Sequence, residues 1–246
     1  MMFDLVWYLA VLAVVAYLGY VALAWWDYGS RHGDARLEPL LDRYLPDWEV
    51  AEHHEILVDA PTRFAYAAAR GLDFESSPVV RAIFRLRQLI MRSNENADIG
   101  SPQLVERMVR LGWGILVELP GRAVVMGAVT QPWRRSPVFQ PLTASEFTAF
   151  NRIGYAKIAW SIKVEPDGPH RSVASTETRV TLTDPVSRAR FRWYWAFLSP
   201  GILLIRRVML RRLKRDAERQ SLGDRTPHRP GTVAERCVPP GSPAMK

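Results

Sequence analysis

An apolar run near the N-terminus constrains this chain more than any other feature. Leu5 to Trp26 is a stretch of 22 residues without a charge, and about 20 apolar residues are enough to cross the hydrocarbon core of a bilayer. Trp and Tyr residues lie near both ends of the run, as they do at the two surfaces of a membrane. We therefore predict a transmembrane anchor over residues 1–28, with residues 5–26 in contact with the membrane.

The same run admits two other interpretations. Ala22–Ala24 would fit the cleavage site of a signal peptide, but no Lys or Arg precedes the run and it is longer than the usual apolar region. A buried core helix is the third interpretation. Arg31 and Arg36 follow the run, so the positive-inside rule predicts a single-pass protein of the inner (cytoplasmic) membrane with its C-terminal domain in the cytoplasm.

The net charge of +8 indicates an anionic partner, such as a membrane surface, a nucleic acid or an acidic protein. Between residues 184 and 219, ten Lys and Arg residues stand against three Asp and Glu residues. Either this segment is a solvated face with charge partners along the helix, or its basic residues meet anionic lipid. The predicted membrane-surface residues are Arg206, Arg207, Arg211, Lys214 and Arg215. A nucleic-acid partner is not expected, because no signature of a nucleic-acid-binding fold is present.

Cysteine usage and metal-ligand spacing add little. Cys237 is the only cysteine, so no disulfide forms within the chain. On a strand, His53 and Glu55 share one face and His54 lies on the other, whereas a zinc site needs three or four converging ligands. We therefore assign no metal, no cofactor and no catalytic residue.

The second half of the chain contains a strand with strict alternation. Over residues 156–164, the apolar side chains of Ile158, Trp160 and Ile162 alternate with polar ones. Such alternation indicates a strand with one buried face and one face in water. Pro and Gly residues at 166–169 then predict a turn into an antiparallel partner.

The partner strand is predicted over residues 171–182. Thr176 and Thr178 share the inward phase with apolar neighbours, and Glu177 and Arg179 are expected to point outward into solvent. Earlier segments predict a strand at 52–58, helices at 62–70 and 78–91, a short helix ending near residue 112 and a hairpin over 113–131. A helical turn is predicted at 143–151.

A long helix is predicted to follow. Pro185 suits the first helical position, and an apolar stripe that includes Trp195 and Met209 keeps helical spacing on both sides of Pro200. One kinked helix from Pro185 to about Gln220 is therefore expected. Residues 29–46 are assigned to a linker with an amphipathic turn, and residues 221–246, rich in proline and glycine, to a disordered tail.

Taken together, these elements predict an α+β domain over residues 47–220, in the order of the helix-grip fold. The stretches "HHEILVDAPTRFAYAA", "WSIKVEPDGPHRSVASTETRV" and "TDPVSRARFRWYW" resemble bacterial members of the START-like or SRPBCC superfamily, which includes polyketide cyclase/dehydrase and birch-pollen-allergen relatives. The resemblance implies an antiparallel sheet wrapped around the last helix. The anchor departs from the usual core of that family, and five or six visible strands fall short of its usual seven.

The resemblance also implies a cavity for a hydrophobic small molecule or lipid. The side chains expected to line it are Ile158, Trp160, Ile162, Thr176, Thr178, Trp195 and Met209. The alternative is that they close-pack into a dry core. The leading hypothesis is a membrane-anchored, non-enzymatic domain that binds such a ligand.

Two other functions remain open. An enzyme of the cyclase or hydratase type needs an acid or a base in the pocket, and the last two strands supply none in the inward phase. A scaffold that binds another protein is favoured if the space is fully packed.

Overall fold

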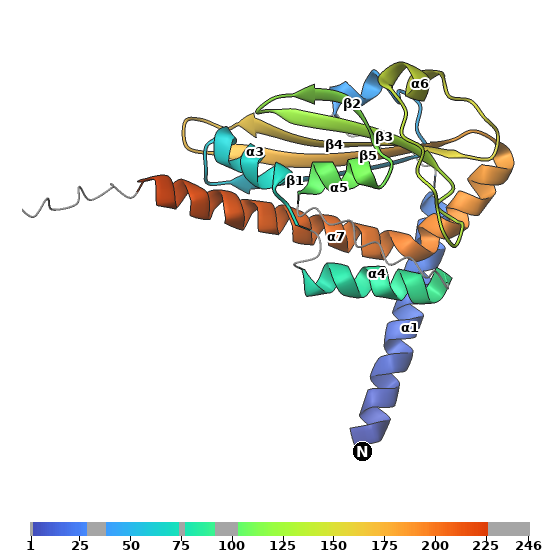
Figure 1. The fold of residues 1–246 in the computed structure, drawn as a ribbon. Coiled ribbons are helices and arrows are strands. Elements are labelled where there is room, and N and C mark those ends of the chain that lie inside the picture. The colour runs from blue at the N-terminus through green and yellow to red at the C-terminus, as the bar shows by residue number, and fades with distance from the viewer. Residues whose placement is uncertain (1, 29–37, 74–76, 92–102, 226–246) are drawn as a thin grey trace, which may run out of the picture.

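The computed structural model describes residues 2–28, 38–73, 77–91 and 103–225 (Figure 1). The helices are α1 (Met2–Asp27), α2 (Pro39–Asp42), α3 (Thr62–Arg70), α4 (Pro78–Met91), α5 (Leu104–Arg110), α6 (Ala144–Ala149) and α7 (Pro185–Arg225). The strands are β1 (Val50–Val58), β2 (Gly114–Leu119), β3 (Ala123–Thr130), β4 (Ala156–Pro166) and β5 (Ser172–Leu182). The predicted α+β class with an antiparallel sheet and a long C-terminal helix is confirmed.

In the described part of the chain, one five-stranded sheet has the order β1-β5-β4-β3-β2, and every pairing is antiparallel. The predicted β2–β3 hairpin is confirmed, with Gly121 at a φ of 76° in its turn, a conformation that glycine adopts without steric cost. β1 closes the far edge against β5, and Val50 lies opposite Val180. The first strand therefore lies beside the last one.

Helix α7 covers one face of this sheet together with α3 and α5 (Figure 1). It is a single 41-residue helix that continues through Pro200, as predicted, and Figure 1 shows it bent. Proline removes one helical hydrogen bond and crowds the preceding turn, which accounts for a bend. The apolar stripe faces inward, and Phe191 and Leu213 are buried. The helix extends beyond the predicted end near Gln220 to Arg225, and Cys237 lies outside the described residues.

The opposite face of the sheet is also covered. Leu41, Tyr44 and Leu45 pack there with Phe147 of α6 and with β3. Within residues 29–46, which we assigned to a linker with an amphipathic turn, residues 38–45 contribute to the core, and residues 29–37 lie outside the described part of the chain. Two covered faces leave β5 buried along nearly all its length.

This second layer corrects the prediction for Glu177 and Arg179. Both side chains point away from α7, but their exposed fractions are only 1% and 0% because the segment around α2 covers them. Arg179 Nε donates to Glu177 Oε1 at 2.7 Å, and a further donor of the same guanidinium reaches Asp42. Glu177 Oε2 accepts from the backbone N of Glu38 at 2.7 Å and lies 3.1 Å from His53 Nδ1. Pairing satisfies charges that alternation alone placed in water.

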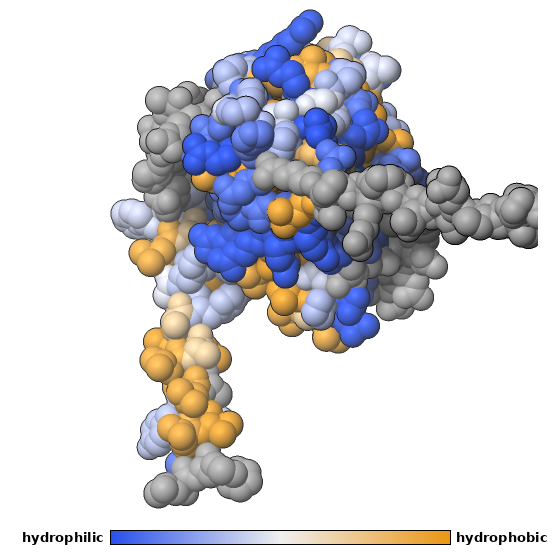
Figure 2. All heavy atoms as spheres, turned by 90° about the vertical axis from the view of Figure 1, so that its left-hand side faces the viewer, coloured by the Kyte–Doolittle hydropathy of each residue, from blue (hydrophilic) through white to orange (hydrophobic). Residues whose placement is uncertain are grey.

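Helix α1 has the length and apolar composition of a membrane span over Asp4–Trp26. Its first turns project from the domain, and Trp7 and Leu12 are 69% and 64% exposed, so the interpretation as a buried core helix is wrong. Its later turns pack against α7. Figure 2 shows hydrophobic surface along the projecting part of α1, below a more hydrophilic body.

Candidate functional site

The interface between the sheet and α7 brings the predicted ligand-binding residues together. Ile162 and Met209 belong to one apolar cluster there, and Trp195 belongs to its neighbour. Ile158 packs against both clusters, and Trp160 packs against the first. Their role in binding stays a prediction.

Two threonines complete this set from β5. Thr178 lies opposite Trp160 in the strand register, and Thr176 lies opposite Ile162. The Thr176 hydroxyl accepts a hydrogen bond from Trp160 Nε1 at 2.8 Å and donates one to the backbone oxygen of Ser161. These bonds hold the indole ring of Trp160 in one orientation on the sheet.

Some side chains between β4 and α7 are only partly buried. β4 is the central strand of five, and its inward side chains pack against the cluster that contains Met209 and Leu213 of α7, so close packing would bury them completely. Ile162 is 3% exposed, as expected, yet Ile158 and Trp160 remain partly exposed. Ile202 and Ile205 of α7 are partly exposed as well. We call the place where these four partly exposed side chains lie between the sheet and α7 the sheet–α7 gap.

Polar side chains from β1 border the sheet–α7 gap. Glu52 and His54 lie opposite Thr178 and Thr176, on the face that α7 covers. Arg206 Nη1 donates to the backbone oxygen of Glu52 at 3.0 Å. Arg206 was predicted at the membrane surface, and the structure instead places its guanidinium against β1.

Burial shifts the pKa values of Glu52, His54 and Arg206. Desolvation raises the pKa of Glu52, although nearby Arg206 and Arg207 oppose the rise. Desolvation, reinforced by the same two arginines, lowers the pKa of His54, so its imidazole is neutral at pH 7. Burial also lowers the pKa of Arg206 to about 10, which leaves it protonated.

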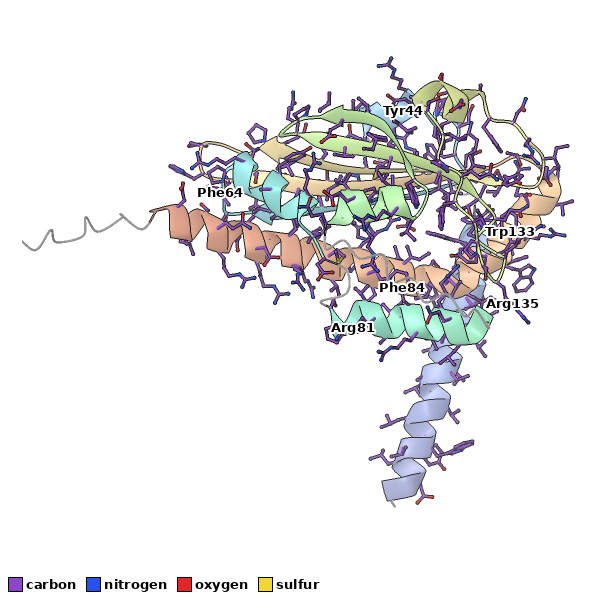
Figure 3. The ribbon with its side chains drawn as sticks, in the orientation of Figure 1. Tyr44, Phe64, Arg81, Phe84, Trp133 and Arg135 are labelled. Carbon is purple, nitrogen blue, oxygen red and sulfur yellow. The ribbon has the colours of Figure 1, made fainter. Side chains whose placement is uncertain are left out.

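Two buried nitrogen atoms near the gap have no hydrogen-bond partner within the described part of the chain. They are Nδ1 of His54 and Nε1 of Trp133. Trp133 packs against the cluster that contains Phe191 and Trp195, beside α7 (Figure 3). A buried polar atom without a partner is uncommon, so these two nitrogen atoms distinguish this part of the core.

The sequence analysis missed Glu52 and His54 as site residues. Both residues lie on the first strand of the domain, outside the two strands from which the pocket lining was predicted, and the histidines at 53 and 54 were considered only as metal ligands. A signal was present, because Glu52 and His54 fall in the same alternating phase as Val50, Ile56 and Val58. Among the described residues, no group of three potential ligands could hold a metal ion.

The other predicted membrane-surface residues differ in their surroundings. Arg207, Arg211 and Arg215 are exposed on α7. Lys214 Nζ instead donates to the backbone oxygen of Leu57 at 2.8 Å and pairs with Asp59 and Glu218. Lys214 therefore ties α7 to the end of β1.

A separate hollow of about 400 Å³ opens to solvent between α3 and α7. Its lining residues are Ala67, Ala68, Gly71, Asp216, Arg219 and Gln220. None of these is a predicted ligand-binding residue. Because small and charged side chains dominate the lining, this hollow offers little apolar surface to a hydrophobic ligand.

No protein-family model matches the sequence, and no curated protein matches it. Fold alone does not establish function, so the functional conclusion depends on the geometry of the sheet–α7 gap and on helix α1.

Proposed function

We propose that this chain is a membrane-anchored START-like (SRPBCC, helix-grip) protein that binds a hydrophobic small molecule or a lipid at the cytoplasmic surface of the inner membrane. The observation that carries the proposal is the partial exposure of Ile158 and Trp160 in the centre of a helix-covered sheet. Apolar side chains that solvent reaches at such a position favour an apolar ligand.

The polar border supports an amphipathic ligand. Arg206, His54 and the indole nitrogen of Trp133 can direct hydrogen bonds to a polar end while Ile158 and Trp160 contact an apolar body. A few fixed polar groups around an apolar surface are typical of small-molecule sites. A lipid or a hydrophobic acid fits this description.

The contacts of α1 support an anchor over a cleaved signal peptide. The Tyr17 hydroxyl donates to the backbone oxygen of Phe197 at 2.6 Å, and Tyr20 shares a hydrogen bond with Ser199. Arg192 donates to the backbone oxygen of Trp25 and lies over its ring. Cleavage after Ala24 would remove the two tyrosines and expose α7.

The tether has a functional consequence. A domain attached beside the bilayer meets lipid ligands at a high effective concentration. Arg31, Arg36 and the basic α7 favour the cytoplasmic side, where anionic headgroups attract positive charge.

Native mass spectrometry of the full chain, released from mild detergent, tests this proposal. We expect the wild type to carry an apolar molecule. Ile158→Trp should fill the sheet–α7 gap and abolish that adduct, whereas the matched control Ile153→Trp should retain it because Ile153 is 78% exposed. A wild type without adduct, or an Ile158→Trp protein with the same adduct, would refute ligand binding and would favour a protein-binding scaffold.

One observation favours an enzyme of the cyclase or hydratase type as the second candidate. Glu52 and His54 border the gap, where desolvation raises the pKa of the Glu52 carboxyl group and lowers the pKa of the His54 imidazole. Carboxyl and imidazole groups act as general acids and bases when they lie within hydrogen-bond reach of a substrate. To distinguish an enzyme from a binding protein, the extracted ligand pool is incubated separately with the wild type, Glu52→Gln and His54→Asn. An enzyme requires a mass change with the wild type that both variants lose while still binding the ligand.

A further inference from the structure

Helix α4 leaves an apolar stripe uncovered. It lies on the side of α7 away from the sheet, and Figure 3 labels Arg81 and Phe84 on it. Val80 is 1% exposed, whereas Val79, Leu86 and Leu89 are 41%, 57% and 75% exposed. With exposed Ala82, the last three follow the helical spacing of one face. We call Val79, Ala82, Leu86 and Leu89 the α4 stripe.

Basic residues flank the α4 stripe. Arg81 and Arg85 are exposed and lie one helical turn apart on the adjoining side of the helix. An apolar face beside a basic face is the pattern of helices that lie in the plane of a membrane interface. A face meant for water would instead carry polar side chains.

The docking of α1 sets the depth of α4. Tyr17 and Tyr20 bond to Phe197 and Ser199 of α7, and Ile83 of α4 approaches α7 at Gly201, two residues further along. Figure 1 shows α4 alongside α7 and crosswise to α1. Residues 197–201 of α7 therefore contact both α4 and the part of α1 that carries Tyr17 and Tyr20.

Counting residues along α1 shows where the membrane surface falls. Asp4 to Ala16, the part of the span before the first docking contact, is 13 residues long and extends about 20 Å. The hydrocarbon core is about 30 Å thick. If the span fills the core, Tyr17 lies about 10 Å inside the far hydrocarbon boundary. The adjacent α4 then lies at about the depth that helices in the membrane interface reach.

Exposed aromatic side chains also lie on the part of α7 that contacts α1. Trp193 and Phe197 are 54% and 42% exposed and stack on each other, and the ring centroid of Trp193 lies 4.1 Å from that of Trp25 near the end of the span. Trp and other aromatic side chains collect at membrane–water interfaces. Trp193 and Phe197 therefore lie where α1 meets the domain and are of the residue types found at the membrane surface.

We propose that α4 is a second, non-spanning membrane contact. It lies in the bilayer interface with the α4 stripe among the acyl chains, while Arg81 and Arg85 meet lipid phosphates. The apolar stripe, the flanking positive charge and the depth of α4 together favour an anionic phospholipid bilayer as the partner of this face. The inference rests on the part of the proposed function in which α1 spans the membrane.

Fluorescence depth measurement on the full chain in anionic phospholipid nanodiscs tests the proposal. In a Cys237→Ser background, a polarity-sensitive probe is attached at Leu86→Cys on α4. Val11→Cys in α1 is the control for the anchor, and Ala149→Cys on α6, which lies across the sheet from α4 (Figure 1), is the control for water. We expect the Leu86 probe to shift to the blue and to be quenched by lipids spin-labelled near the headgroup, and the Ala149 probe to show neither effect.

The outcomes separate the two claims. Quenching at Val11 without quenching at Leu86 overturns the α4 contact and leaves the anchor intact. No quenching at either position overturns the anchor and α4 together. A blue shift at Leu86 that depends on protein concentration, without quenching by lipid, identifies a second copy of the chain as the occupant and overturns the proposal.

A charge variant provides an independent measurement. Leu86→Glu should raise the rate of amide hydrogen exchange in α4 in nanodiscs, because a carboxylate at this depth opposes insertion. The rate should approach the value measured after the lipid has been extracted with cyclodextrin. Thr148→Glu on exposed α6 should leave exchange of α4 unchanged. Equal exchange of α4 in wild type and Leu86→Glu would contradict membrane insertion.

Discussion

The buried pair of Glu177 and Arg179 allows a quantitative test of the second layer on the sheet. Replacing Arg179 by Met keeps an apolar side chain of similar length and removes the guanidinium. The Glu177 carboxylate, 1% exposed, then loses its hydrogen bond from Arg179 Nε at 2.7 Å. The backbone oxygens of Glu38 and Leu45 also lose their donor.

The size of the effect follows from burial. Breaking a buried ion pair by removal of one partner costs about 3–5 kcal/mol, because the remaining charge is uncompensated. The contact with Asp42 adds little, since Asp42 is 62% exposed and exposed pairs contribute less than about 1 kcal/mol. We therefore expect Arg179→Met to lower the free energy of unfolding by about 3–5 kcal/mol, a large part of the 5–15 kcal/mol typical of a domain.

Urea unfolding of the detergent-solubilised full chain, followed by tryptophan fluorescence, measures this loss. Arg211→Met on the exposed side of α7 is the matched control and should change stability by less than about 0.5 kcal/mol. Glu177→Leu/Arg179→Met should lose less than the sum of the two single variants, because no charge is left alone. A loss below about 1 kcal/mol for Arg179→Met, or additive losses, would refute the argument.

Three further predictions concern the site and the packing. Burial keeps the folded-state pKa of His54 below the unfolded value of about 6.5, so unfolding binds a proton and wild-type stability falls as pH drops below that value. Parallel urea titrations at several pH values should show a smaller fall for His54→Asn. Phe147→Ala empties a fully buried site and should cost about 3–5 kcal/mol by urea unfolding, against less than about 0.5 kcal/mol for exposed Thr148→Ala. Gly112→Ala should lower Tm, because the φ of Gly112 is 98° and an added Cβ would collide with a backbone carbonyl oxygen. The control Gly223→Ala should leave Tm unchanged, because the space around Gly223 is open.

Periodicity accounted for most of the fold. The alternation in β4 and β5, the hairpin turn at Gly121 and the stripe of α7 through Pro200 all correspond to the structure. These features are local, because backbone geometry sets the spacing of side chains that share a face. The turn residues likewise act within a few positions of themselves.

The site was predicted less completely. The predicted apolar lining residues meet at the sheet–α7 interface, but Glu52, His54 and the inward turn of Arg206 were not foreseen. Arg206 lies on a helix rich in arginine, and several of these residues, such as Arg207 and Arg211, are exposed, so composition favoured a surface position for it. Its actual partner is a backbone oxygen on β1, more than 150 residues away in the sequence.

The sequence by itself determined the apolar helix, the antiparallel strands and the continuous α7, since each depends on residues only a few positions apart. Only the tertiary structure decided that residues 38–45 bury Glu177 and Arg179, that β1 brings Glu52 and His54 beneath α7, and that α4 lies beside the docked end of α1. The physical reason is that a strand or helix specifies which side chains share a face, whereas the partner of that face comes from distant parts of the chain.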